Sequence, residues 1–337
     1  MPSSPRAEPP RPPSALSGRL RPAGLIAAAG MALLLAGCST RPPPHVTDQF
    51  CGSRAGRPVV GFHEERASRP EALVARGLSP DAVRTAEIIG ALGALEALLT
   101  AEQLGRPSLD LLFARQALTD RVLLAMLDVS ATLGAIDCEG ERGDQLRGEL
   151  QRREARRSRN LGLAGVLVGA TTAALTGGLS LWGAEASGNV AGIVGGSLEA
   201  AIGGALLNSG TSGTLVSRGN LLGEIHRLPG HSTLFPPTVW RYLTHREAPG
   251  QANVAEEILA QWRRAGLVED ADGEDALFLA EGRFSIGDME RRDAMLDLLE
   301  ARVALMSRDL RLLLDELVSR PLPRPGGRGP ARSAGTP

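Results

Sequence analysis

A run of uncharged, glycine-rich sequence lies in the middle of the chain and restricts its fold more than any other feature. Residues 160–184 contain no charged side chain, and a second Gly/Ala-rich segment at 190–207 follows after a short turn. Small residues recur four positions apart in both segments, at Gly165, Gly169, Ala173 and Gly177, then at Gly192, Gly196, Ala200 and Gly204. Such residues form one ridge of an α-helix, so each segment presents a groove almost without side chains. The pattern predicts a helical hairpin over 161–207 whose two backbones pack closely.

Composition favours helices along the whole chain. Aromatic residues make up only 3% of the sequence, and the apolar positions are mainly Leu, Ala and Val. Leu and Ala are strong helix formers, whereas aromatic and β-branched residues are enriched in strands. We therefore predict an all-α fold: a helical bundle with a Gly/Ala-rich helical hairpin, a long C-terminal amphipathic helix and at most one small β-hairpin.

The N-terminal residues have the organisation of an export signal. Four arginines and one acid occupy residues 1–22, and residues 23–37 are uncharged and mostly apolar. This order is typical of a secretory signal peptide, and the apolar part is shorter than the roughly 20 residues that span a membrane. The sequence Leu35-Ala36-Gly37-Cys38 resembles the lipobox of bacterial lipoproteins. The resemblance implies that residues 1–37 are cleaved and that Cys38 becomes the acylated N-terminus. The alternatives are an uncleaved anchor and a chance match to the lipobox.

The same resemblance implies a location. Many such lipoproteins are retained in the inner membrane by an Asp after the cysteine, and Ser39 stands there instead. We expect a cell outer-membrane lipoprotein that is held by membrane lipid at Cys38 and faces mainly the periplasm. Removal of the signal leaves a net charge of −4, since four arginines and one acid are lost from a chain of net charge −1. In an oxidising periplasm, Cys51 and Cys138 predict a disulfide, with two buried thiols as the alternative.

Residues 38–78 are expected to form a lipid-anchored, Pro-rich linker and an irregular segment, and residues 79–160 a helical domain. Ser79-Pro80-Asp81 provides an N-cap, a first-turn proline and an acid, which predict a helix that runs to about Gly105. Ser108 begins a second helix, which should pack antiparallel to the first. The expected buried stripes are Ile88, Leu92, Leu95 and Leu99 in the first helix, and Leu118, Val122, Met126, Val129, Leu133 and Ile136 in the second.

Residues 208–284 are predicted to be a loop-rich connector. Short helices are expected at 239–245 and 254–266, and the Asp272-Gly273 pair predicts a β-hairpin between 266–268 and 276–279. Residues 285–319 should form an amphipathic helix prone to coiled-coil packing, with the a/d seam Leu296, Leu299, Val303, Met306, Leu310, Leu313 and Leu317. Residues 320–337 are rich in Pro, Gly and Arg and are predicted to be a disordered tail.

The two-segment glycine pattern is similar to the glycine-zipper hairpins of some outer-membrane lipoproteins, including the rickettsial surface-antigen type and the surface-exclusion lipoproteins of conjugative plasmids. In those families the hairpin is taken to insert in the outer membrane and to mediate oligomerisation. The likeness covers about fifty residues and concerns the hairpin alone. It implies helix packing through six glycines: Gly165, Gly169, Gly177, Gly192, Gly196 and Gly204.

Two features bear on whether the hairpin enters a membrane. Five arginines precede it and suit contact with phosphate head groups: Arg152, Arg153, Arg156, Arg157 and Arg159. Glu199 favours the opposite, because a carboxylate at mid-span costs about 3 kcal/mol unless it faces a partner or water. An inserted hairpin and a buried helix pair in a periplasmic bundle are both compatible with the sequence.

No residue pattern indicates catalysis, a cofactor or a metal site. Pro229-Gly230 separates His226 from His231, so no helix presents both imidazoles. The acids Asp270, Asp272, Glu274 and Glu281 lack the glycine position of a calcium loop, and Ser197 lacks a nucleophile elbow. Residues 252–300 carry 13 acids and five arginines and would repel nucleic acid.

The sequence thus predicts a non-enzymatic lipoprotein that acts as a self-associating structural or assembly component of the cell envelope. A homo-oligomer is expected, and an envelope protein is a further possible partner. The alternative is a lipid-tethered periplasmic adaptor that docks a partner through residues 285–319, with the hairpin as soluble core. An envelope hydrolase is a remote third hypothesis.

Overall fold

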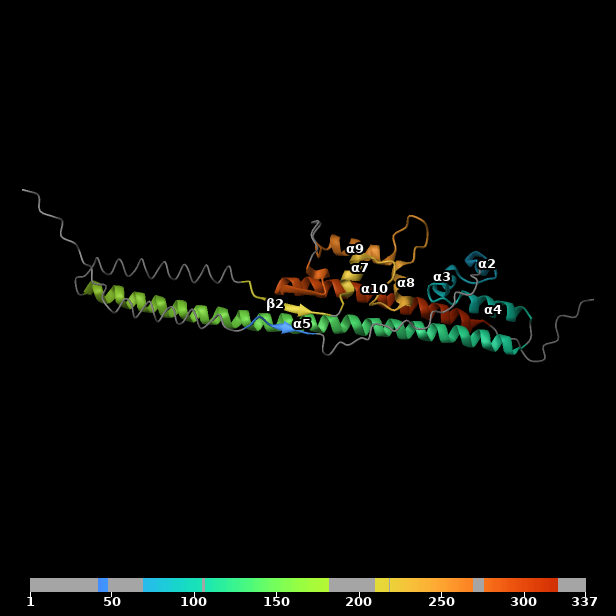
Figure 1. Cartoon of the computed structure of the whole chain (residues 1–337), viewed down its shortest axis with the longest axis horizontal. Helices are drawn as coiled ribbons and strands as arrows, with labels where there is room; N and C mark the ends of the chain where they lie inside the picture. The colour runs from blue at the N-terminus through green and yellow to red at the C-terminus, as the bar shows by residue number, and fades with distance from the viewer. Residues whose placement is uncertain are drawn as a thin grey trace, which may run out of the picture. The chain divides into compact units, whose positions relative to one another are not determined.

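The computed structural model describes residues 42–47, 69–104, 107–181, 210–217, 219–268 and 276–320. The chain divides into two compact units, Met1–Pro43 and Pro44–Pro337, and every helix and strand below belongs to the second unit. The predicted all-α class is confirmed, because the described residues form eight α-helices, one 3-10 turn and three short strands (Figure 1).

The helices are α2 (Pro70–Ala75), α3 (Pro80–Ile88), α4 (Leu92–Gln103), α5 (Leu109–Leu181), α7 (Leu221–Arg227), α8 (Pro237–Thr244), α9 (Val254–Arg264) and α10 (Ile286–Ser319). The 3-10 turn η1 covers Ala276–Phe278. The strands are β1 (His45–Val46), β2 (Ser212–Val216) and β3 (Glu281–Ser285).

The first predicted helix begins as expected but is broken into α3 and α4. The Ser79 hydroxyl accepts a hydrogen bond from the Ala82 amide at 3.2 Å, which caps α3. The chain then turns at Gly90, where φ is +68°. A side chain disfavours this left-handed conformation, so glycine is the residue that allows the turn. The prediction of one uninterrupted helix was therefore wrong, although its apolar stripe is buried as expected.

Helix α5 packs antiparallel to α4, as predicted. Arg115 contacts Glu102 at 3.6 Å near the junction, whereas Arg121 donates to the Gly90 carbonyl at 3.3 Å farther along both helices. The Ser108 hydroxyl accepts from the Leu111 amide at 3.2 Å and caps α5. In the predicted stripe of α5, Met126 is an exception, since its side chain is exposed.

The main core forms where α10 lies along α5 (Figure 1). Every residue of the predicted a/d seam of α10 is buried, which confirms the 3-4 spacing. Helix α10 starts with a capping box, in which Ser285 and Asp288 bond to each other's backbone amides. Because this seam packs within the chain, it is not a free docking surface, and the adaptor alternative would need a different face.

A small sheet joins distant parts of the chain. Its order is β1-β2-β3, with His45 beside Thr214 in a parallel pair and Thr214 beside Arg283 in an antiparallel pair. Gly213 allows β2 to lie close to α5, because a Cβ there would be 2.6 Å from Leu146 Cδ1. This sheet was not predicted.

Two other local predictions were wrong. The hairpin expected around Asp272-Gly273 does not form, because residues 276–278 are a 3-10 turn and the strand that follows pairs with β2 instead. A short helix, α2, lies in the segment predicted to be irregular. The helices expected at 239–245 and 254–266 are confirmed as α8 and α9.

Candidate functional site

The last part of α5 differs from the rest of the helix in its burial. Leu150 is the last side chain of α5 that is described as buried, and every described side chain from 151 onward is exposed or half-buried. Yet α5 is one continuous helix of 73 residues (Figure 1). We call residues 151–181 the arm, and the other described residues from Pro44 onward the body. The first half of the predicted hairpin is thus helical, and it continues the preceding helix without a break.

The predicted head-group cluster lies at the start of the arm. Its members are Arg152, Arg153, Arg156, Arg157 and Arg159, all of which are exposed except Arg153, which is half-buried. At about 100° per residue they share one side of the helix. Glu149 accepts hydrogen bonds from Arg153 at 3.0 Å and from Arg152 at 3.2 Å, and these bonds lower the pKa of the Glu149 carboxyl. The cluster therefore presents a strongly cationic surface next to the uncharged part of the arm.

The uncharged part of the arm exposes large apolar side chains. Leu163, Val166 and Leu167 are 59%, 70% and 68% exposed. A Cβ added at Gly165 would meet no atom within 4 Å among the described residues. No described helix is both long and apolar enough to cross a membrane. The uncharged part of the arm thus exposes an apolar surface at Leu163, Val166 and Leu167.

Several predicted site residues lie outside the described residues. These are Cys38, Cys51, Gly192, Gly196 and Gly204, together with Ser197 and Glu199. Gly169 and Gly177 lie in the arm with Gly165, but the second half of the hairpin is not described, so packing through the glycines stays a prediction. Cys138, in the body part of α5, is disulfide-bonded. Its pairing with Cys51 also stays a prediction.

The two histidines do not meet. The His226 ring stacks on Phe278 at a centroid distance of 4.0 Å, whereas exposed His231 lies in the loop after α7. Glu224 is buried and organises that loop: it accepts from the Thr233 amide at 3.0 Å, the Thr233 hydroxyl at 2.8 Å and the Ser232 hydroxyl. Within the described ranges, no group of three His, Cys, Asp or Glu side chains could hold a metal ion.

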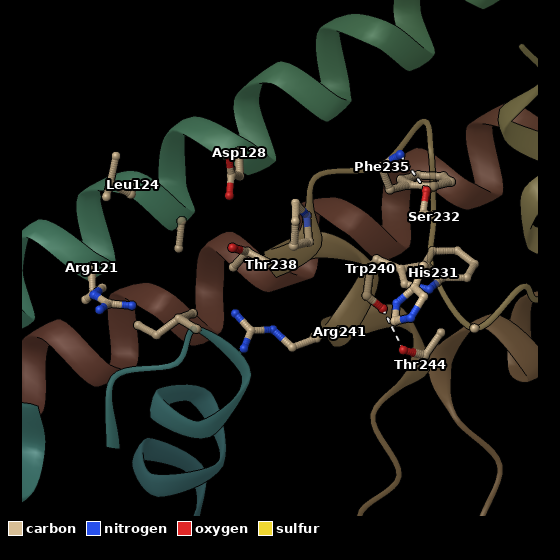
Figure 2. A pocket seen from close by; sticks show the side chains of 14 residues that line it. Arg121, Leu124, Asp128, His231, Ser232, Phe235, Thr238, Trp240, Arg241 and Thr244 are labelled. Atoms are coloured by element: carbon tan, nitrogen blue, oxygen red, sulfur yellow. Dashed lines mark hydrogen bonds between the residues drawn. The ribbon is translucent and has the colours of Figure 1, made fainter. Parts of the chain in front are cut away.

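That loop forms one wall of a pocket of about 490 Å³, which we call the α5–α8 pocket (Figure 2). Helix α5 contributes Arg121, Leu124 and Asp128 to it, and α8 contributes Trp240 and Arg241. The Ser232 hydroxyl holds the loop in place by accepting hydrogen bonds from the amides of Leu234 at 3.1 Å and Phe235 at 2.7 Å. The Phe235 and Trp240 rings stack with centroids 5.6 Å apart. The pocket therefore combines an aromatic wall with charged groups.

Two guanidinium groups approach each other at this pocket. A Cβ built on Gly90 would be 3.5 Å from Arg241 Nη1 and Nη2 and 3.6 Å from Arg121 Nη1. One carboxyl, that of Asp128, also lines the pocket. Burial raises the pKa of Asp128, against the lowering effects of a hydrogen bond from Thr238 and the charge of Arg241. The pocket thus places one carboxyl near two guanidinium groups, and the charge of Arg241 already acts on that carboxyl.

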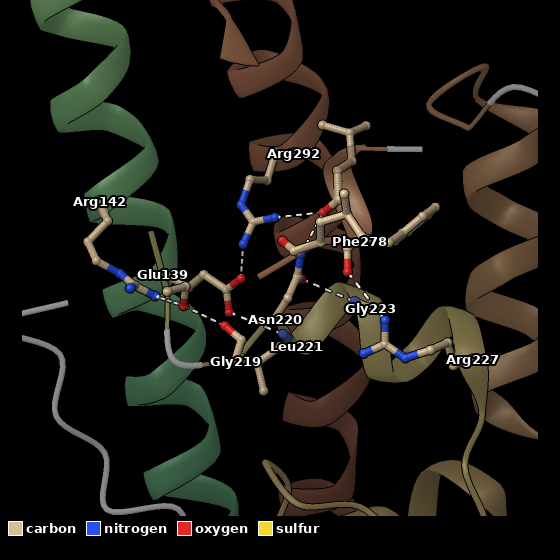
Figure 3. A network of polar contacts seen from close by, with 12 residues as sticks. Glu139, Arg142, Gly219, Asn220, Leu221, Gly223, Arg227, Phe278 and Arg292 are labelled. Carbon is tan, nitrogen blue, oxygen red and sulfur yellow. Dashed lines mark hydrogen bonds and ion pairs between the residues drawn. The ribbon is translucent and has the colours of Figure 1, made fainter. Parts of the chain in front are cut away.

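A second polar cluster is buried and joins four parts of the body (Figure 3). Arg292 of α10 forms an ion pair with Glu139 of α5, and both side chains are at most 3% exposed. Arg292 also donates to the Leu277 carbonyl at 2.8 Å, and Asn220 donates to the same oxygen at 2.6 Å. Its burial and its backbone partners indicate a structural role, because the network holds η1 and the start of α7 against the two long helices.

The pocket and the buried network were missed by the sequence prediction. A weak signal exists, since Arg121 and Asp128 are seven residues apart and flank the buried stripe of α5. No local sequence pattern, however, predicts that α8 lies opposite Arg121 and Asp128. Comparisons of the chain with protein-family models, with curated proteins and with solved structures find no match.

Proposed function

We propose that this chain is a lipid-tethered envelope protein that associates with copies of itself through the arm. The observation that carries the proposal is the exposure of Leu163, Val166 and Leu167 on an uncharged helix. Full burial of one such side chain contributes roughly 1.5–3 kcal/mol. Burying all three in an oligomer would therefore provide several kcal/mol for each copy. The glycines of the arm support the same proposal, because small residues let neighbouring helices approach closely.

The tether and the location rest on the sequence. The signal-like residues 1–37 and the lipobox-like residues 35–38 support acylation of Cys38 and transport to the outer membrane. The arginine cluster of the arm suits contact with the phosphates of lipid head groups near that anchor. In this proposal the lipid fixes the protein at the membrane surface, and the arm joins the copies into a structural assembly.

The oligomeric state of the full chain in mild detergent tests the proposal by light scattering after size exclusion. The wild type should form an oligomer, and the double variant Val166→Asn with Leu167→Asn should be monomeric. Val318 provides a matched control, since it is 73% exposed on α10 and lies outside the arm. Val318→Asn should leave the oligomer intact. A monomeric wild type, or an oligomer that survives the double variant, would contradict self-association through the arm.

Membrane extraction tests the tether separately. Cys38→Ala should release the protein from membranes in alkaline carbonate, while the oligomer persists. Retention of this variant in the membrane pellet would show instead that either the hairpin or an uncleaved N-terminal segment is embedded in lipid. Release of the wild type together with the variant would contradict the lipid anchor.

A further inference from the structure

The side of α5 that is turned away from the core continues from the body into the arm. Leu118, Val129 and Ile136 mark the core side of the helix. On the opposite side, exposed residues recur every three, four or seven positions between Leu109 and Val166. At about 100° per residue, such spacing keeps them within roughly 80° of the helix circumference. We call this exposed side of α5 the outer stripe.

The outer stripe carries large apolar side chains near both of its ends. They form one group at residues 109–127 of the body and another at residues 163–166 of the arm. All six are more than half exposed: Leu109 69%, Leu112 60%, Leu123 53%, Leu127 57%, Leu163 59% and Val166 70%. Exposed apolar surface of this extent marks an interaction site rather than ordinary protein surface.

The charges of the two halves of the stripe have opposite signs. In residues 109–137 every exposed charged side chain is an acid, namely Asp110, Asp120 or Asp137. The two arginines of that stretch are half-buried and bonded within the chain, Arg115 to Glu102 and Arg121 to the Gly90 carbonyl. Residues 152–159 instead hold five arginines and one acid. The halves therefore attract each other when they belong to different copies, whereas two identical halves repel.

We propose that two copies of the chain pair antiparallel along the outer stripe, so that the arm of each copy packs on residues 109–127 of the other. In this register Leu112 lies opposite Leu163, Leu109 lies opposite Val166, and Asp120 lies beside Arg156. A parallel pair would instead place the five arginines of one copy against those of the other. The inference rests on the proposed self-association of the arm and names the surface that receives it.

The length of the stripe suits a stable dimer. Residues 109–166 extend about 87 Å at 1.5 Å per residue. In a pair of packed helices about four positions in seven contact the partner, which gives roughly 30 residues from each copy. Stable interfaces use about 20–30 residues a side. The antiparallel pair therefore buries enough of each copy, and it covers both apolar groups at once.

The dissociation constant of the full chain in mild detergent, measured by light scattering over a dilution series, tests the receiving surface. Leu109→Asn with Leu112→Asn should raise this constant at least tenfold, and both side chains are already exposed, so the fold should persist. Leu312→Asn is the matched control, since Leu312 is 48% exposed on α10 and lies outside the stripe. This control should change the constant less than twofold.

The same measurement separates this inference from the proposed function. The arm variant Val166→Asn with Leu167→Asn should dissociate the oligomer under both proposals. If it does so while Leu109→Asn with Leu112→Asn leaves the constant unchanged, self-association through the arm stands and the antiparallel pairing is overturned. A monomeric wild type would contradict both.

Charge reversal tests the direction of the pairing. Asp120→Arg should raise the dissociation constant at least threefold, because it places two arginines side by side at both ends of the pair. Adding Arg156→Asp in the same chain should restore the wild-type constant to within twofold. In a parallel pair residue 120 faces residue 120 of the other copy, so no such rescue is expected. A single variant without effect, or a double variant as weak as the single one, would overturn the antiparallel register.

Discussion

The body and the arm share one helix but not one source of stability. In the body, α5 buries residues such as Val122, Val129 and Ile136 against its neighbours. In the arm, the described part of the same helix buries nothing, and its apolar side chains are exposed. Isolated helices draw little stability from propensity alone, and packing provides most of it. The difference teaches that continuity of a helix is no measure of how firmly its two ends are held.

Gly223 of the body and two glycines of the arm differ in the same way. In the body, Gly223 lies where a Cβ would be 2.5 Å from the Phe278 carbonyl oxygen, so the absent side chain permits contact between two backbones. In the arm, a Cβ at Gly162 or Gly165 would meet no described atom within 4 Å. Gly223 thus serves a contact that the structure shows, whereas Gly162 and Gly165 face open space among the described residues.

The largest expected effect comes from the buried network of the body. Glu139→Ala should lower the free energy of unfolding by about 3–5 kcal/mol, because it leaves Arg292 buried without its charged partner. Chemical denaturation monitored by circular dichroism measures the change. The matched surface pair is Arg311 and Asp315, whose side chains are 81% and 64% exposed. Asp315→Ala should cost less than about 1 kcal/mol, and a similar loss for both variants would contradict the structural role of the network.

A smaller loss is expected where two backbones meet. Gly223→Ala should destabilise the body by about 1–3 kcal/mol, since the new methyl group would push against the Phe278 carbonyl and the turn must shift. The midpoint of thermal unfolding, followed at 222 nm as a general helix signal, reports the loss. An unchanged midpoint would show that η1 is not held as tightly as its contacts indicate.

The corresponding change in the arm should have the opposite sign. Gly162→Ala should stabilise the helix locally by up to about 1 kcal/mol, because alanine is the better helix former and space is open there. Hydrogen exchange of the arm amides should become slower, while the thermal midpoint of the body stays the same. A shift in the body midpoint would show that the two regions unfold together.

The smallest effect concerns pH and again singles out the body. Burial raises the pKa of Asp128 above its ordinary value of 3.8, so the folded state keeps this proton to higher pH than the unfolded state does. The wild type therefore loses stability as the pH rises from about 3.8 through the folded pKa. Asp128→Asn removes this loss. The thermal midpoint of the variant should therefore rise relative to that of the wild type as the pH increases over that range.

Asp288 provides a control of opposite sign. Its burial acts to raise the pKa, but hydrogen bonds from Ser285 and Arg291 outweigh this effect and lower it. The wild type thus gains stability as the pH rises from the lowered pKa toward 3.8. The thermal midpoint of Asp288→Asn should therefore fall relative to that of the wild type over that range. If the thermal midpoints of the Asp128 and Asp288 variants change in the same direction with pH relative to the wild type, the opposite pKa shifts of the two carboxyls would be contradicted.

Elements with a strong local signal could be predicted from the sequence. The spacing of Leu299, Val303 and Met306 predicted a buried face of α10, and Ser79 predicted the start of α3. Both signals are local, since a helix buries residues at fixed intervals and its first turn needs a cap. The position of the break at Gly90 was missed, because a single glycine is also tolerated inside a helix.

Features that depend on distant contacts could not be predicted. The strand Ser212–Val216 pairs with His45–Val46 and with Glu281–Ser285, which are distant in sequence, and only two of its five residues are β-branched. The α5–α8 pocket needs Arg121 and Arg241, which are far apart in sequence and come together only when α8 packs beside α5. Likewise, the pairing of Glu139 with Arg292 follows from the antiparallel packing of two long helices.

The continuity of α5 has a mechanical consequence. No proline interrupts the helix between Leu109 and Leu181, so it lacks the commonest cause of a sharp kink. At about 1.5 Å per residue, Val166 is roughly 57 Å along the axis from Asp128. One uninterrupted helix therefore connects the exposed arm with the wall of the α5–α8 pocket, and between them it is held in the core by Val129, Ile136 and Leu150.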